Sequence, residues 1–259
     1  MEDVYLLANG FGRLALRALG VRVHAAGATH VPCEGPVILA ANHVSFPDFV
    51  LVQKAVLSRG RYIRFMTRAD VWHGRLLSFA MDRMGHIPVA RGTAPGAYLH
   101  ARRLLGAGEA VGVFPEAGIS HSYTVRPLMR GVAALARDTG APVVPVAVWG
   151  GQRIASVGDP NPAPDLTRGR RVDVAFGSPW YVGPDADLLA ATNELGHRMT
   201  ALLESLQRLP EHRPRPGEIA TWYPAHLGGH APTRERARAL DVVPASAVPP
   251  TWGPPPRVV

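Results

Sequence analysis

The chain has 259 residues, of which 47% are hydrophobic and 19% charged, so it is long enough and apolar enough for one large folded domain. Its formal net charge is +8 at pH 7, which reflects either a compositional preference for arginine or an attraction to anionic partners. The single cysteine, Cys33, excludes an internal disulfide, and no run of about 18 apolar residues predicts a membrane span.

The first predicted element is an amphipathic helix over residues 4–20. Its apolar residues recur every three or four positions, at Val4, Leu7, Phe11 and Leu14, and Arg13 and Arg17 project away from that stripe. Such a helix either lies on a membrane surface or packs on its own domain, and the pattern leaves both open.

Strand-like and helix-like stretches then alternate from Pro36 to Val148. Short apolar runs predict strands at Val37–Ala41, Arg61–Met66, His86–Val89, Val111–Phe114 and Pro142–Trp149. Helical spacing predicts helices at Asp48–Leu57, Val71–Met84, Pro95–Leu105 and Leu128–Arg137.

A strand at Arg171–Phe176 and a long helix at Asp185–Leu209 follow. The predicted fold class is therefore α/β, a single layered domain with a mixed central sheet flanked by helices. After Pro210 the chain is rich in proline, and we expect a tail that is either draped over the domain or disordered. The expected division is 1–24, an amphipathic membrane-associating helix; 25–209, the main domain; and 210–259, the tail.

A polar cluster, Asn-His-Val-Ser-Phe-Pro-Asp, follows the strand that ends at Ala41. Ligand sites of α/β folds lie where a buried strand meets a helix start. His43 is a candidate general base, and Asp48, five residues on, can fold back to one imidazole nitrogen and fix the tautomer. The alternative is structural: Ser45 caps the helix, Asp48 completes a capping box, and His43 is a surface residue.

Three further clusters follow in order. Gly85 to Arg91 brings an arginine to the end of a short extended segment, Val113 to Gly118 is a strand end with Pro-Glu and a glycine turn, and Ala141 to Val146 is a strand with a proline inside it. Each alone is unremarkable: a surface arginine, a turn and an edge strand.

Together, the four clusters resemble the motif blocks of the lysophosphatidic acid and glycerol-3-phosphate acyltransferase family over roughly residues 36–150. The resemblance implies that His43 and Asp48 form the catalytic pair. It also implies that Arg91 and the third-block residues Glu116, Gly118 and Ser120 help to bind the acceptor substrate. No metal is implied, and no cofactor beyond the donor substrate, an acyl-CoA or acyl carrier protein.

One departure from the family pattern concerns the acceptor. Where the family has Glu-Gly-Thr-Arg-Ser, this chain has Glu-Ala-Gly-Ile-Ser, so Ile119 replaces an arginine. Two alternatives follow: Arg126 or Arg130, close by in sequence, takes over its role, or the acceptor is a lysophospholipid or lipid hydroxyl other than lysophosphatidic acid.

The expected reaction is direct transfer of an acyl group to a lysophospholipid hydroxyl in phospholipid biosynthesis, with His43 as general base. A lipid substrate implies peripheral attachment to the inner face of the plasma membrane, on the cytoplasmic side. The alternative is a non-catalytic lipid- or acyl-CoA-binding protein that retains the fold. The sequence contains no phosphate loop, no Gly-x-Ser-x-Gly elbow and no aromatic-interleaved basic pattern, so nucleic acid is not an expected partner.

Overall fold

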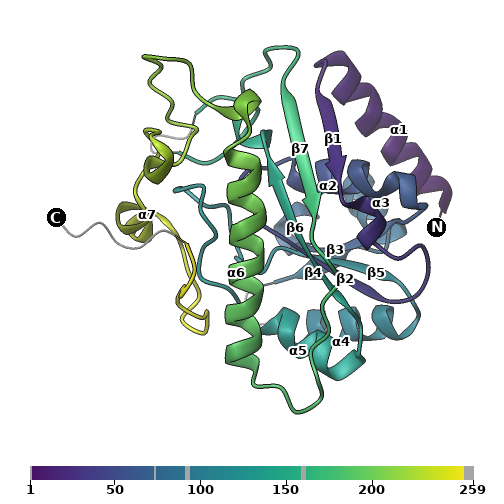
Figure 1. Ribbon diagram of the computed structural model, residues 1–259. Coiled ribbons are helices and arrows are strands. Elements are labelled where there is room, and N and C mark those ends of the chain that lie inside the picture. Colours follow the sequence, from purple (N-terminus) through teal and green to yellow (C-terminus); the bar gives the residue numbers. More distant parts are fainter. Residues whose placement is uncertain (1, 73, 91–93, 159–161, 254–259) are drawn as a thin grey trace.

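The computed structural model describes residues 2–72, 74–90, 94–158 and 162–253. Within these ranges the chain forms one seven-stranded sheet with the strand order β1-β7-β6-β2-β5-β3-β4 (Figure 1). The strands are β1 (Arg22–Ala26), β2 (Val37–Ala41), β3 (Ile63–Arg68), β4 (Ile87–Val89), β5 (Ala110–Val113), β6 (Val143–Trp149) and β7 (Arg171–Phe176).

The sheet is mixed, as the sequence predicted. Strands β6, β2, β5, β3 and β4 run parallel to one another, β1 pairs with β7 in parallel, and β7 runs antiparallel to β6. All five residues of β2 are buried, which explains its continuous apolar sequence, because a central parallel strand is covered on both faces.

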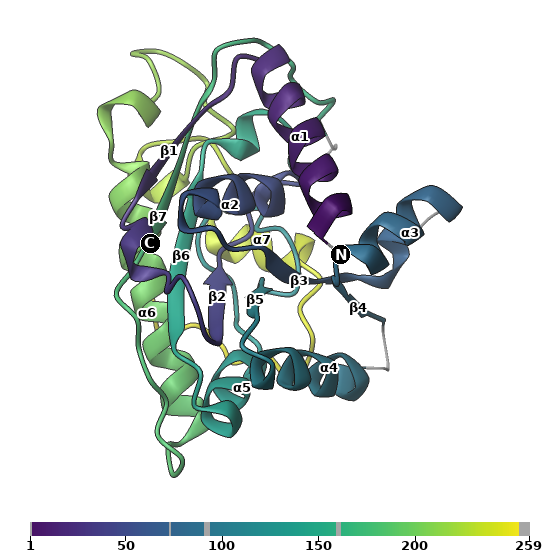
Figure 2. The same ribbon diagram turned by 90° about the vertical axis from the view of Figure 1, so that its right-hand side faces the viewer.

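Helices cover both faces of the sheet (Figures 1 and 2). On one face lie α4 (Ala94–Gly106), α5 (Gly131–Thr139) and α6 (Leu188–Gln207); on the other lies α2 (Asp48–Val56), with α1 (Glu2–Ala18) and α3 (Arg75–Arg83) outside it. A short helix, α7 (Arg234–Leu240), belongs to the C-terminal part of the chain.

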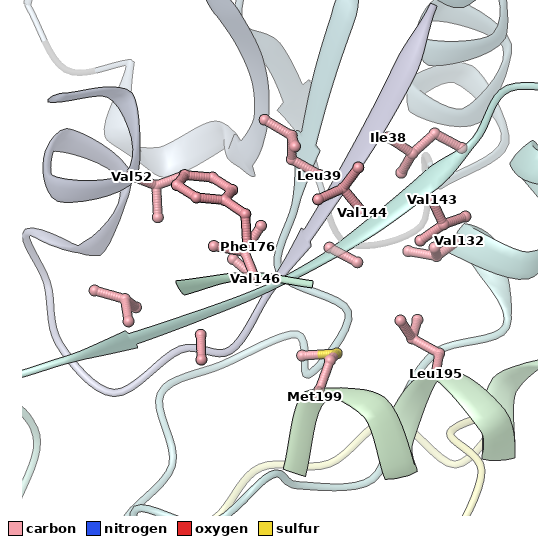
Figure 3. Packing of buried hydrophobic residues seen from close by; sticks show 14 of the residues in the cluster. Ile38, Leu39, Val52, Val132, Val143, Val144, Val146, Phe176, Leu195 and Met199 are labelled. Atoms are coloured by element: carbon pink, nitrogen blue, oxygen red, sulfur yellow. The ribbon is translucent and has the colours of Figure 1, made fainter. Parts of the chain in front are cut away.

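The core fills the two layers between the sheet and the helices. Ile38 and Val143 point toward Val132 of α5, whereas Leu39 lies on the side of Val52 of α2 (Figure 3). Alternate residues of a strand point to opposite faces, so a single apolar strand serves both layers.

Two predictions from sequence need correction. Strand β1 was not predicted, because it is mostly exposed and shows no apolar alternation. The interpretation of the proline-containing strand as an edge strand is wrong: β6 lies between β2 and β7. Proline lacks only the N–H donor, which in a strand faces the same side as the carbonyl of its own residue. The Pro145 carbonyl accepts the N–H of Gly177, just beyond the last residue of β7, so the missing donor faces the side where the ladder has already ended.

Residues 210–253, the C-terminal segment, are draped over the domain, one of the two states left open. Trp252 is buried at 2% exposure against Gly196 of α6, and its indole N–H donates to the carbonyl of Val125 over 3.2 Å. A β-bridge joins Val248 to Leu128. The division of the chain at residues 24 and 209 stays a prediction.

Candidate active site

The first and third sequence blocks meet at the carboxyl edge of the sheet. Strands β2 and β5 are parallel neighbours in which Ala40 pairs with Val113, so the residues that follow each strand leave the sheet side by side. The backbone N–H of His43 accordingly donates to Glu116 Oε1 over 2.7 Å. Register alone therefore brings together residues 73 positions apart.

His43 and Asp48 form a hydrogen-bonded pair. The chain turns back at Pro47, α2 begins at Asp48, and the carboxylate Oδ2 lies 2.9 Å from His43 Nδ1. The His43 side chain is 20% exposed, whereas that of Asp48 is fully buried. Because the carboxylate also accepts backbone N–H groups, Nδ1 must be the donor, which leaves Nε2 as the nitrogen able to take a proton.

The Asp48 carboxylate is held by more than its histidine. Oδ2 accepts the N–H groups of Val44 over 2.7 Å and Ser45 over 2.8 Å, and Oδ1 accepts the Ser45 hydroxyl. The alternative of Ser45 as helix cap does not describe this end of α2, because Pro47 occupies the cap position and the Ser45 hydroxyl donates to the carboxylate. Gly151 packs against Ser45 so closely that a Cβ there would collide with its Oγ.

Phe114 stacks on the imidazole of His43. The ring centroids are 4.4 Å apart at 25°, and Phe65 stacks behind Phe114 at 5.9 Å and 11°. The hydrogen bond to Asp48 fixes the position of Nδ1. The stacked ring of Phe114 also restricts the remaining rotation of the imidazole. This role of Phe114 was not predicted from its position in the sequence.

Glu116 is a fully buried clamp rather than a group open to solvent. Its Oε1 accepts from the N–H of His43 and its Oε2 from the N–H of Arg126 over 2.8 Å. Burial raises the pKa of Glu116 to about 8, although both N–H donors act in the opposite direction. The carboxyl group therefore ties the first block to the third-block loop, residues 114–126.

The rest of the third-block loop is also bonded internally. Ser120 donates its N–H to the His43 carbonyl over 2.9 Å and its hydroxyl to Thr124 over 2.7 Å. Gly118 lies against the guanidinium of Arg126, where a Cβ would approach Nη1 to 2.6 Å. Ala117 has φ of 54°, in the left-handed region that glycine adopts most readily, at the position where the family pattern has glycine.

Arg126 is buried, and its guanidinium is already occupied. Nη1 donates to the Ile119 carbonyl and Nη2 to the Val242 carbonyl, each over 2.9 Å, and Nε lies 3.4 Å from Asp241. A role for Glu116, Gly118, Ser120 and Arg126 in binding the acceptor stays a prediction; their present contacts are within the protein.

Arg91 lies outside the described residues. Strand β4, which precedes it, ends at Val89, and β4 is parallel to β3 at the end of the sheet. The role of Arg91 also stays a prediction.

An acyl chain needs an apolar groove, and the candidates by position in the sequence, which do not form one cluster, are Phe46, Leu51, Phe65, Phe79 and Met84. Phe65 and Leu51 are buried in the core, Met84 is half-buried, and Phe46 and Phe79 are 57% and 51% exposed. Phe65 and Leu51 are therefore core residues.

Asn42 has a role that the sequence analysis overlooked. Its amide donates to the Val148 carbonyl over 3.2 Å and accepts the Val148 N–H over 2.7 Å. The side chain thus continues the β2–β6 ladder for one more residue while the backbone turns away toward His43. An asparagine directly after a buried strand was the available signal.

Among the described residues, no group of three or more histidine, cysteine, aspartate or glutamate side chains could hold a metal ion. What the site presents is a half-buried imidazole whose Nδ1 is anchored on a carboxylate. That arrangement suits proton abstraction from a hydroxyl.

Comparisons with known proteins find similarity to acyltransferases. A family model described as Acyltransferase matches residues 22–149. The chain is 28% identical over 171 residues to 1-acyl-sn-glycerol-3-phosphate acyltransferase BAT2, chloroplastic, of Brassica napus, which covers 64% of this chain and 47% of that protein. It is 28% identical over 230 residues to lyso-ornithine lipid O-acyltransferase of Brucella abortus, over 77% of this chain and 82% of that protein.

The fold has a counterpart among solved structures. The 1-acyl-sn-glycerophosphate acyltransferase PlsC of Thermotoga maritima superimposes with a TM-score of 0.65 at 20% sequence identity, over 80% of this chain and 79% of that one. At this identity the likeness establishes the α/β fold. The chain spans about half the length of the Brassica relative, 47%, and most of the Brucella one.

Proposed function

We propose that this chain is an O-acyltransferase of the 1-acyl-sn-glycerol-3-phosphate acyltransferase family, which moves an acyl group from a thioester to a lysolipid hydroxyl. The observation that carries this proposal is the His43–Asp48 pair: Nδ1 is bonded to the buried carboxylate at 2.9 Å, and the imidazole is partly exposed.

The proposed reaction is a direct displacement. His43 Nε2 removes the proton of the acceptor hydroxyl while that oxygen forms a bond to the thioester carbonyl carbon. The C–S bond breaks, the thiolate leaves with its electron pair, and the proton passes from the imidazolium to the thiolate. Asp48 balances the positive charge of the imidazolium, and general-base assistance of this kind is worth about 10²- to 10⁴-fold.

We infer the class of acceptor from the residues of the third block. A phosphomonoester needs an open cationic partner. Within the third block, Ile119 stands where the family has arginine, and the Arg126 guanidinium donates to two carbonyls and pairs with Asp241, which leaves Arg91, outside the described residues, as the predicted arginine of the site. The third block thus favours a lysolipid other than lysophosphatidic acid. The Brucella relative is named for a lyso-ornithine lipid, so an amino-acid headgroup belongs in the acceptor panel.

Helix α1 supports a peripheral site of action on a membrane. Leu6, Leu7, Phe11 and Leu14 are 56–75% exposed, although Tyr5 of the same helix is buried against the domain. Beside α1 lies α3, which adds exposed Leu77 and Phe79 (Figure 2). No described helix is long and apolar enough to cross a membrane.

Basic residues accompany this apolar surface. Arg13, Arg17 and Lys54 line a cavity of about 520 Å³ between α1, α2 and β1. Cationic side chains next to an apolar helix face attract anionic headgroups, which are enriched in the cytoplasmic leaflet. We therefore place the enzyme at the inner face of the plasma membrane.

The deciding experiment measures product formation by mass spectrometry from long-chain acyl-CoA or acyl carrier protein. The acceptors are lysophosphatidic acid, lyso-ornithine lipid and a neutral lysophospholipid. His43→Ala is compared with His24→Ala, in which an exposed histidine of β1 is removed. Transfer that is lost only with His43 supports the proposal. If folded wild-type protein binds acyl-CoA but transfers nothing from either donor, the alternative of a lipid- or acyl-CoA-binding protein is correct.

A further inference from the structure

The C-terminal segment meets the third-block loop at one buried acidic residue, Asp241. The side chain of Asp241 is 6% exposed and lies at the end of α7, where its own N–H closes the helix on Ala237. Carbonyl groups at a helix C-terminus disfavour a nearby negative charge. A carboxylate in this position therefore depends on partners outside the helix.

Those partners come from the third-block loop. Asp241 Oδ1 lies 2.8 Å from His121 Nδ1 and 3.4 Å from the His121 N–H, and Oδ2 lies 3.4 Å from Arg126 Nε. The carbonyl of the next residue, Val242, accepts a bond from Arg126 Nη2 over 2.9 Å. The C-terminal segment thus contacts the third-block loop through both the side chain of Asp241 and the backbone of Val242.

The third-block loop connects these contacts to His43. Arg126, held by Asp241, donates its N–H to Glu116 and its Nη1 to the Ile119 carbonyl. Glu116 accepts the N–H of His43 over 2.7 Å, and Ser120 donates to the His43 carbonyl over 2.9 Å. Both backbone groups of His43 therefore depend on a loop that the C-terminal segment fixes in place.

We propose that Asp241 is a positioning residue of the active site, and that the C-terminal segment completes the site by holding the loop that orients His43. The inference rests on the acyltransfer proposed above. It assigns a role to the region after Pro210, which lies beyond the 22–149 match to the family model.

Electrostatics agree with this connection. Burial is the main cause of the raised pKa of Glu116, and the charge of Asp241 contributes in the same direction. Ala117 and Tyr123 have left-handed φ angles of 54° and 55°, so the backbone of the third-block loop is strained. Contacts from outside the loop are needed to hold this conformation.

The kinetic test compares Asp241→Asn with Glu235→Gln, which removes an exposed acid from the same helix. A displaced general base slows the reaction without weakening substrate binding. We expect kcat of Asp241→Asn to fall on the order of 10- to 100-fold while KM for donor and acceptor stays within about two-fold. An unchanged kcat in folded protein, or a raised KM at unchanged kcat, overturns the proposal.

A second readout does not depend on activity. Amide hydrogen exchange followed by mass spectrometry should speed up at His43, Ser120 and Arg126 in Asp241→Asn, and not in Glu235→Gln. If wild-type protein transfers no acyl group, the proposed function fails, while faster exchange still supports the hold on the loop. Exchange that is unchanged in Asp241→Asn overturns that hold in either case.

Discussion

Replacing Asp48 by asparagine tests the charge of the proposed catalytic pair, His43 and Asp48, separately from its geometry. The carboxylate accepts three N–H donors on Oδ2 and only the Ser45 hydroxyl on Oδ1. An asparagine can keep its oxygen at the Oδ2 position, and the Ser45 hydroxyl can rotate to accept from the amide. We therefore expect Asp48→Asn to fold, at a cost of about 1–2 kcal/mol for the lost charge assistance.

The loss of activity should be much larger than the loss of stability. An imidazolium 2.9 Å from a carboxylate gains about 6 kcal/mol at an effective dielectric constant near 20, which corresponds to roughly 10⁴ in rate. The His43 side chain is 20% exposed, and solvent screening reduces that gain. Because His43 is charged only after proton transfer, we expect kcat to fall between about 10² and 10⁴ with little change in KM.

The assay is steady-state acyl transfer with product detection by mass spectrometry. Detection of released thiol needs a correction, because Cys33 is free and exposed. The matched control is Asp185→Asn, in which the acid is exposed ahead of α6. A kcat of Asp48→Asn within about three-fold of wild type, with thermal unfolding showing intact protein, would refute the electrostatic reasoning.

Three other outcomes follow from individual contacts. The pKa of Glu116 is raised from 4.5 to about 8, so the folded state binds the proton more tightly than the unfolded state. The stability that this group contributes should therefore be lost as pH rises from about 5 to 8. In urea unfolding, the unfolding free energy of Glu116→Gln should depend less on pH over this window than that of wild type. Ala117→Gly should raise the unfolding free energy by about 0.5–1 kcal/mol in thermal or urea unfolding, because the residue has φ of 54°. Serine at both Leu7 and Phe11, which are 67% and 75% exposed, should weaken sedimentation with anionic vesicles by about 10-fold or more without lowering the melting temperature.

Each of these can fail clearly. Identical pH dependence in wild type and Glu116→Gln would mean that this carboxyl is ionised in the folded state across the window. A less stable Ala117→Gly variant would show that the backbone entropy of glycine outweighs the strain. Vesicle binding unaffected by the two serines would remove α1 from the membrane contact.

The sequence predicted the order of the main elements except β1, and it predicted the His43–Asp48 pair. Apolar runs and helical spacing identified the core strands and helices because a buried strand or an amphipathic helix carries its own pattern. The Asn-His-x4-Asp block placed His43 and Asp48 at a strand-to-helix turn, where the structure has them bonded. Strand β1 was missed because an exposed strand depends on its partner, β7, rather than on its own residues.

What only the tertiary structure decided is how distant segments are paired around His43. The bond from its N–H to Glu116 depends on the β2–β5 register, and the stacking of Phe114 depends on the same two strands lying side by side. Asp241 could not be connected to the site from sequence at all, because nothing local to a proline-rich segment specifies where it docks. The seven residues 42–48 contain both His43 and Asp48, whereas the position of this pair depends on contacts between residues far apart along the chain.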